Sequence, residues 1–255
     1  MKLSDGKVVL VTGGARGIGR GIVDVFSQHG AYVVVLDIND EDARKAAQAA
    51  ESACGRKSIS MHLDVANPNN VRQVMDAVVD EFGCIDVLVN NAAIMRNHDI
   101  LDFPLEDWRD VFRINVEGVF LCSQEAARKM VELKTGGVII NISSCAANKA
   151  DRRHAAYSAS KAAVITFTRI LALELGQYGI RANAVLPGAT GPTDMLQSVF
   201  DNVPGIEQEL ISRTTLSKLA TPQDQGNAAL FLASDLASHI TGEYLIVAGG
   251  EFMNA

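Results

Sequence analysis

Two residues four positions apart, Tyr157 and Lys161, carry side chains suited to proton transfer. The segment around them is rich in alanine, which predicts a helix with both side chains on one face. A free tyrosine titrates near pH ~10 and a free lysine near ~10.4, and a cation beside the phenol lowers the phenol's pKa. Tyr157 can then donate and accept a proton near neutral pH. The alternative is an ordinary surface pair, because this spacing is common, so neighbouring motifs must decide.

A glycine-rich segment follows the first apolar run of the chain. Residues 8–11 predict a strand buried on both faces, and residues 12–19 then lead into a helical pattern. Glycines at such a turn let the backbone approach a pyrophosphate at the positive end of the helix. The segment therefore favours a dinucleotide site over a simple turn.

A carboxylate, Asp37, ends the second apolar run, about twenty residues beyond the glycines. In this position a carboxylate accepts hydrogen bonds from the adenosine ribose 2′-OH and repels a 2′-phosphate, which favours NAD. The alternative is a helix N-cap or a loop charge.

Apolar runs and helical patterns alternate along the chain without a linker. This order predicts a single α/β domain over residues 1–255, a doubly wound Rossmann-type fold with a parallel seven-stranded sheet and helices on both faces. An irregular insert at about 188–215 predicts a substrate lid. Asn115 lies inside a helical pattern, where a buried amide is often only locally satisfied. The expected strands are residues 8–11, 32–36, 58–63, 85–89, 137–142, 180–186 and 244–247.

The composition narrows the classes of protein. The chain has 255 residues, a net charge of −7 and 48 % hydrophobic residues, which indicates a globular protein and argues against a nucleic-acid binder. The four cysteines and five histidines lack metal-ligand spacing, so we expect free thiols, no metal site and a cytoplasmic location. Neither a signal peptide nor a membrane span is expected.

Several motifs in one order resemble the short-chain dehydrogenase/reductase family over essentially the whole chain. They are Thr12-Gly13-x-x-x-Gly17-x-Gly19, Asp64, Asn90-Asn91-Ala92, Asn115, Ser144, Tyr157-x-x-x-Lys161 and Pro187-Gly188. Two departures stand out. Ala93 replaces the glycine of the family's Asn-Asn-Ala-Gly, and the segment after Pro187-Gly188 is one residue longer, which leaves open whether Thr190 or Thr193 contacts the nicotinamide.

The resemblance implies roles for four residues, here called the tetrad. Ser144 polarises the reacting oxygen, Tyr157 exchanges the proton, Lys161 lowers the pKa of Tyr157 and binds the nicotinamide ribose, and Asn115 orders a water in the proton relay. Substrate contacts are expected from Ser144, Tyr157, Arg96 and His154. Cofactor contacts are expected from Gly13, Arg16, Gly17, Ile18, Gly19, Asp37, Asp64, Val65, Asn91, Ala92, Tyr157, Lys161, Pro187, Gly188 and Thr190.

The expected activity is hydride transfer between NAD(H) and a secondary alcohol or ketone. The alternatives are an NADPH-dependent 3-oxoacyl thioester reductase, in which Arg16 would contact the 2′-phosphate, and a non-catalytic dinucleotide-binding regulator. The resemblance also implies a homo-oligomer, a tetramer. Polar residues near the expected pocket suggest a small polar substrate such as a polyol, sugar or hydroxy acid, and the basic ones form a positive cluster that could attract an anionic substrate. The alternative is that they are solvated loop residues or subunit contacts, and apolar residues of the insert weaken the argument. The polar residues are Arg96, Asn97, His98, Asn148, Lys149, Arg152, Arg153 and His154, and the apolar ones are Met195, Leu196, Val199 and Phe200.

Overall fold

The computed structural model describes residues 3–203 and 205–252, and its centre is one sheet. All strand pairs in it are parallel, in the order β3-β2-β1-β4-β5-β6-β7. The predicted seven-stranded parallel sheet is therefore confirmed. The strands are β1 (Val8–Thr12), β2 (Tyr32–Asp37), β3 (Ser58–His62), β4 (Val87–Asn90), β5 (Gly137–Ile142), β6 (Ile180–Pro187) and β7 (Tyr244–Val247).

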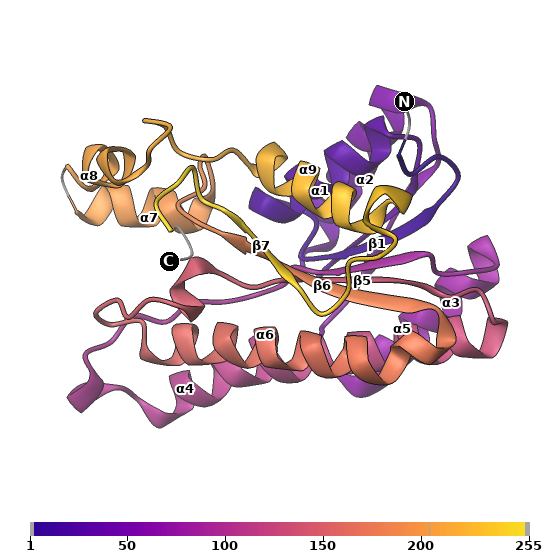
Figure 1. Ribbon diagram of the computed structural model, residues 1–255, viewed down its shortest axis with the longest axis horizontal. Coiled ribbons are helices and arrows are strands. Elements are labelled where there is room, and N and C mark those ends of the chain that lie inside the picture. The colour runs from indigo at the N-terminus through magenta and orange to yellow at the C-terminus, as the bar shows by residue number, and fades with distance from the viewer. Residues whose placement is uncertain (1–2, 204, 253–255) are drawn as a thin grey trace.

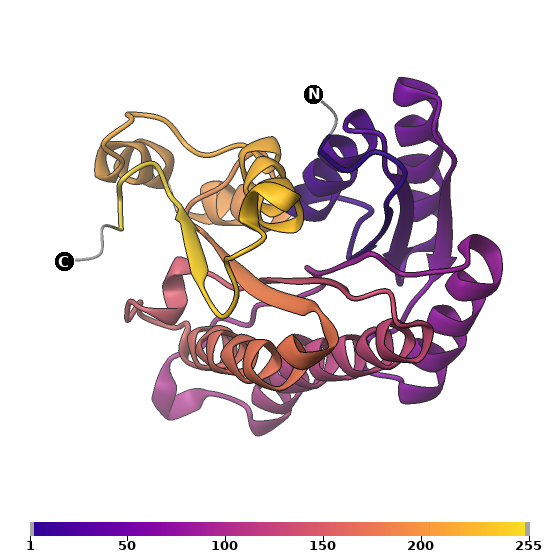
Figure 2. The same cartoon turned by 45° about the vertical axis from the view of Figure 1, so that its right-hand side comes forward.

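Helices cover both faces of the sheet, as predicted (Figures 1 and 2). Side chains alternate along each strand, so Val9 and Val11 pack on one face while Val8 and Leu10 pack on the other. The first face is covered by α1 (Gly17–Gln28), α2 (Asp40–Cys54) and α9 (Pro222–Ala233). The second is covered by α3 (Pro68–Phe82), α5 (Gly118–Leu133) and α6 (Ala155–Leu175).

Two glycines allow α9 to approach α1 closely, directly behind the glycine-rich turn. A Cβ added to Gly21 would lie 2.4 Å from the backbone carbon of Pro222, and one added to Gly226 would lie 2.8 Å from the Gly21 carbonyl oxygen. Real side chains do not reach such distances, so the packing depends on both glycines. The contact holds α9 against α1, the helix that follows the turn expected to hold the cofactor.

The structure corrects two details of the sequence prediction and adds one. β4 begins at Val87 rather than at residue 85, although Ile85 is buried in the core. Asn115 lies in a helical segment, as predicted, and this segment is a π-helical turn, Arg113–Glu117, between α4 (Leu105–Phe112) and α5. The insert after β6 is not irregular, because it contains α7 (Asp194–Asn202) and α8 (Ile206–Arg213), which lie together at the left of Figure 1. Among the described residues, no helix is long and apolar enough to cross a membrane.

Candidate active site

The first turns of α6 place Tyr157 and Lys161 beside the carboxyl end of β5. Lys161 is almost completely buried, and its Nζ donates a hydrogen bond of 2.8 Å to the carbonyl oxygen of Ile142. The same Nζ lies 5.7 Å from the centre of the Tyr157 ring. The two side chains therefore share one face of the helix, as their spacing predicted.

Two serines at the end of β5 complete this side of the site. Ser144 accepts a hydrogen bond of 3.1 Å from the Ala146 N–H, and its hydroxyl lowers the pKa of the nearby Tyr157 phenol. Ser143, which the sequence prediction omitted, is buried and donates a hydrogen bond of 2.8 Å to the Lys161 carbonyl oxygen. Ser143 thus connects β5 to α6. In the sequence, its position next to Ser144 was the feature that could have pointed to this role.

Burial controls the titration of both catalytic candidates. It raises the pKa of Tyr157, while the interaction with Ser144 lowers it. Burial also lowers the pKa of Lys161 to about 8. We expected Lys161 to lower the Tyr157 pKa, but here burial is the largest effect, because the ammonium is itself destabilised and lies against the Ile142 carbonyl.

Asn115 is buried at the π-helical turn, and its side-chain amide is hydrogen-bonded to other protein groups. Its Oδ1 accepts a hydrogen bond of 2.8 Å from the Ile94 N–H, and its Nδ2 donates to the Ile94 carbonyl oxygen at 2.9 Å and to Ser160 Oγ at 3.1 Å. Ser160 Oγ in turn donates to the Tyr157 carbonyl oxygen at 2.7 Å. The side chain therefore anchors the Tyr157 helix turn to the segment after β4. The role of Asn115 in ordering a water stays a prediction.

The glycine-rich turn is held by close backbone contacts. Gly13 and Gly17 adopt positive φ values of 61° and 55°, which favour glycine. A Cβ added to Gly19 would lie 2.0 Å from the Gly13 carbonyl oxygen and 2.5 Å from Asn91 Nδ2. Asn91 Nδ2 donates to the carbonyl oxygens of Thr12 and Gly13 at 3.0 and 2.9 Å. Asn91 thus stabilises the conformation of the turn.

This turn fits the pyrophosphate of a dinucleotide. The N-cap of α1 is Arg16, whose side chain makes no capping hydrogen bond among the described atoms. The N–H groups of the first helical turn are thus left without a side-chain acceptor, and they can serve a phosphate. Ile18 is partly buried and packs against the core beside the turn.

Two further acidic residues lie at the ends of β2 and β3. Asp37 is partly exposed, and its carboxylate accepts hydrogen bonds of 3.1 Å from the Ala15 N–H and 3.0 Å from the Asn39 N–H. Asp64 accepts a bond of 3.0 Å from the Ala66 N–H, and the adjacent Val65 is buried. Ala15 belongs to the glycine-rich turn, so Asp37 lies beside it, as a ribose-binding carboxylate must.

The two candidate threonines after β6 differ in orientation. Thr190 is buried, and its hydroxyl donates to the Gly188 carbonyl oxygen at 3.0 Å and accepts from Gln225 Nε2 at 3.0 Å. Thr193 lies beside the glycine-rich turn, with its Cγ2 3.6 Å from the position a Gly17 Cβ would take. The Thr193 hydroxyl also bonds within the protein, donating to the Thr190 carbonyl oxygen at 3.2 Å and accepting from the Leu196 N–H at 3.2 Å. Thr193 thus contacts the turn while Thr190 packs inward, and the nicotinamide contact predicted for Thr190 stays a prediction.

Most of the predicted basic cluster is paired with nearby acceptors. Arg96 Nε lies 3.7 Å from Asp107 Oδ1, His98 Nε2 lies 2.6 Å from Asp107 Oδ2, and Lys149 Nζ lies 3.5 Å from Asp151 Oδ1. The positive charges of Arg96 and Lys149 are therefore offset, whereas no ion pair of Arg152 or Arg153 occurs among the described residues. Arg153 also donates to the Asn97 carbonyl oxygen, and Asn148 is exposed.

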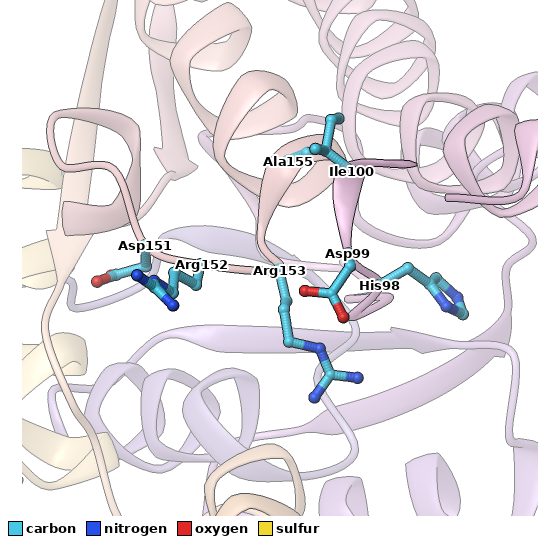
Figure 3. Close-up of a pocket in the computed structure, with 7 residues that line it drawn as sticks. All are labelled: His98, Asp99, Ile100, Asp151, Arg152, Arg153 and Ala155. Carbon is cyan, nitrogen blue, oxygen red and sulfur yellow. The ribbon is translucent and has the colours of Figure 1, made fainter. Parts of the chain in front are cut away.

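Residues of this cluster line a pocket of about 400 Å³ (Figure 3). It lies between residues 98–100 and residues 151–155, and none of the four tetrad residues lines it. His154 is closer to the chemistry, because its ring centre is 6.3 Å from that of Tyr157 and its buried Nδ1 has no partner among the described atoms. In the insert, Leu196 and Phe200 are partly buried, whereas the side chains of Met195 and Val199 lie outside the described part.

The chain matches known proteins over nearly its whole length. A family model described as enoyl-(acyl carrier protein) reductase matches residues 13–251. An L-rhamnose 1-dehydrogenase (NAD(P)(+)) from Sphingomonas sp. (strain SKA58) is 36 % identical over 100 % of this chain and 99 % of its own. A 2,5-dichloro-2,5-cyclohexadiene-1,4-diol dehydrogenase from Sphingobium indicum is 39 % identical over 96 % of each chain.

The chain belongs to the short-chain dehydrogenase/reductase family. A solved structure of this family, a 7α-hydroxysteroid dehydrogenase complexed with NADH and 7-oxo glycochenodeoxycholic acid, superposes with a TM-score of 0.91 and is 37 % identical, covering 97 % of this chain and 94 % of its own. The protein is therefore an oxidoreductase that acts with a nicotinamide dinucleotide. Its relatives act on different substrates, so the family alone does not identify the substrate. No group of residues suited to hold a metal occurs in the described ranges.

Proposed function

We propose that this short-chain dehydrogenase/reductase uses Ser144, Tyr157 and Lys161 to interconvert a secondary alcohol and a ketone. The observation that carries the proposal is the position of Tyr157 beside buried Lys161 on one helix face, with this helix bonded to the end of β5 that carries Ser144. The dinucleotide, when bound, accepts or supplies the hydride. Tyr157 takes the proton from the alcohol during oxidation, and Ser144 holds the reacting oxygen.

The other two members of the tetrad support Tyr157. Lys161 is buried and Tyr157 is partly buried beside it, so their protons are lost in steps that belong to the pair. The ion pair of phenolate and ammonium has the same net charge as the pair of neutral groups, and this form contains the base. Asn115 acts through Ser160, which bonds to the Tyr157 carbonyl, and so positions the helix turn.

We further propose that the cofactor is NAD. Asp37 supports this, because a carboxylate beside the glycine-rich turn accepts the 2′-OH and repels a 2′-phosphate. Arg16 is the counter-charge available in the turn, and its Nη1 lies 2.9 Å from Asp194 Oδ2 of the insert. The pairing offsets the positive charge that NADP would need.

The test is the ratio of kcat/KM for NAD to that for NADP in Asp37→Ala. We expect this ratio to fall by at least tenfold, and the matched variant Asp40→Ala, in the next exposed carboxylate, to keep it. Equal use of both cofactors by the unmodified enzyme would contradict NAD selectivity while leaving the catalytic roles intact.

The substrate we propose is small and polar: a polyol, sugar or hydroxy acid. Two observations support this class: the polar residues that line the pocket between residues 98–100 and 151–155, and the unpartnered Nδ1 of His154 beside Tyr157. The named activity of the rhamnose dehydrogenase relative agrees with it. A lid formed by residues 188–215 would cover the substrate, with partly buried Leu196 and Phe200 on α7.

A competition assay separates this substrate class from its alternatives. It compares a polyol or sugar acid with a long-chain alcohol and a steroid alcohol, and separately tests a 3-oxoacyl thioester with NADPH. We expect the highest kcat/KM for the polar alcohol. The thioester is the second candidate, because a 3-oxoacyl-[acyl-carrier-protein] reductase from Vibrio cholerae is 36 % identical over 98 % of this chain and 98 % of its own. Absence of turnover with every substrate, together with tight NADH binding, would instead support a regulator.

We also propose a cytoplasmic homotetramer. Apolar side chains remain exposed on α5 and α6, where Phe120 is 42 %, Ile170 44 % and Leu173 80 % exposed, and burial of such a face favours association. The four cysteines are free thiols, as a reducing compartment requires. Sedimentation should show a species of about four times 27.2 kDa, and a 27.2 kDa species at micromolar concentration would contradict it.

A further inference from the structure

A glutamine side chain, Gln225, lies completely buried on the inner side of α9. The other buried residues of this helix are apolar or small, and Ala228, Ala229 and Leu232 are buried in the adjacent core. A buried amide costs free energy unless it is hydrogen-bonded, and an apolar side chain would be the ordinary choice in such a place. Gln225 therefore calls for an explanation that packing alone does not give.

The amide of Gln225 joins three elements that are distant in sequence. Its Nε2 donates to Thr190 Oγ1 at 3.0 Å and to the Val247 carbonyl oxygen at 3.1 Å, so both of its hydrogens are used. Its Oε1 has no partner among the described atoms. The side chain thus satisfies two acceptors on neighbouring segments while leaving its own acceptor unsatisfied.

The Thr190 bond holds the start of the insert in one conformation. Thr190 Oγ1 donates to the Gly188 carbonyl oxygen at 3.0 Å, and the Gly188 N–H donates to the Val247 carbonyl oxygen at 3.1 Å. Gly191 N–H also donates to the Ala220 carbonyl oxygen at 2.9 Å. These bonds direct the chain from β6 toward the glycine-rich turn, where Thr193 contacts the space beside Gly17.

We propose that Gln225 is a positioning residue for the cofactor: through Thr190 it holds residues 188–193, which carry Thr193, against the glycine-rich turn. The inference rests on the proposed cofactor site. Gln225 itself contacts neither the tetrad nor the turn in any hydrogen bond among the described residues. Its effect must therefore reach the dinucleotide through the segment after β6.

The experiment is a double-mutant cycle on the full-length enzyme, with the variants Gln225→Leu, Thr190→Val and the double variant. The Kd for NADH is measured by fluorescence titration, and the KM for the alcohol and kcat are measured in parallel. We expect each single variant to weaken NADH binding by about tenfold, the range for loss of one buried hydrogen bond. The double variant should bind NADH no more weakly than the more weakened single variant, because both substitutions remove the same hydrogen bond between Gln225 and Thr190.

A matched control is available on the same helix. Gln223 is exposed two residues earlier, so Gln223→Leu should leave the Kd for NADH unchanged. Should Gln225→Leu fail to fold, Gln225→Met keeps an unbranched side chain of similar length without a donor, and the same cycle is run with it. A merely structural role would lower the melting temperature without coupling the two positions in NADH affinity.

The outcomes separate this inference from the proposed function. Unchanged NADH affinity in the Gln225 variants, or Kd changes that add in the double variant, overturns the positioning role. Failure of the unmodified enzyme to bind NADH overturns the proposed cofactor site itself. Coupled loss of NADH affinity, with the KM for the alcohol changed less than the Kd for NADH, supports the inference.

Discussion

The glycine-rich turn and the insert after β6 face the same proposed cofactor, but they are held by different forces. In the turn, the Gly13 carbonyl oxygen lies where a Gly19 side chain would have to be, and Asn91 donates two hydrogen bonds to the backbone. The helical part of the insert, from α7 onward, is attached to the turn by the ion pair of Arg16 and Asp194, whose side chains are both 74 % exposed. An exposed ion pair contributes only about 0–1 kcal/mol.

This difference explains why the glycine-rich turn can be recognised in the sequence and the insert after β6 cannot. Close backbone contacts exclude every residue except glycine, so the turn leaves a recognisable motif. Exposed ion pairs and short helices impose no such requirement, so many sequences can form an insert of this kind. A region that must change shape around a substrate also needs weak attachments. The variants below test the comparison, from the largest expected effect to the smallest.

Tyr157→Phe should have the largest effect, on the side of the site supported by the sheet. Loss of the general acid–base should lower kcat by at least ~10²-fold. The phenyl ring fills the same place, so the Kd for NADH should change by less than about twofold. Steady-state kinetics and a fluorescence titration measure the two quantities, and near-normal kcat would refute the role of Tyr157.

Gly19→Ala should break the rigid turn. The added methyl group overlaps backbone of Gly13, and overpacking of this kind typically costs about 1–3 kcal/mol, or roughly 5- to 150-fold in NADH affinity. Isothermal titration with NADH measures the change. Gly176→Ala is the matched control, because a Cβ there meets no atom within 4 Å and its φ is negative. Equal NADH affinity in Gly19→Ala would mean that the turn is as adaptable as the insert.

The pH profile should show that Tyr157 and Lys161 titrate together. Alcohol oxidation needs the Tyr157–Lys161 pair after it has lost one proton. The kcat/KM for alcohol oxidation should therefore rise with pH through the lowered Lys161 pKa of about 8. In Lys161→Met only Tyr157 titrates, and burial raises its pKa above the usual value near ~10, so the rise should move to higher pH. An unchanged profile in this variant would separate Lys161 from the proton transfer.

Asp194→Asn should have the smallest effect, because it removes one exposed ion pair from the insert. Arg16 is then free to meet a 2′-phosphate, so affinity for NADP should rise by up to about fivefold while affinity for NAD stays the same. Asp201→Asn, on the same helix and exposed, is the control. A change above tenfold would show that the insert is held more tightly than its contacts indicate.

The sequence alone led to the family, the seven parallel strands and the candidate residues of the site. This was possible because buried parallel strands are continuous apolar runs and because the turn and the tetrad need particular residue types at particular spacings. The spacing of Tyr157 and Lys161 translated directly into a shared helix face. Assignment of roles to these residues remains a prediction.

Only the tertiary structure decided how these side chains are satisfied. It paired Asn115 with Ile94 and Ser160, turned Thr190 inward to Gln225, and paired the basic cluster with Asp107 and Asp151. It also set the direction of the Tyr157 pKa through burial. None of this follows from residue type or spacing, because hydrogen-bond partners and burial depend on segments that are distant in sequence and meet only in the folded chain.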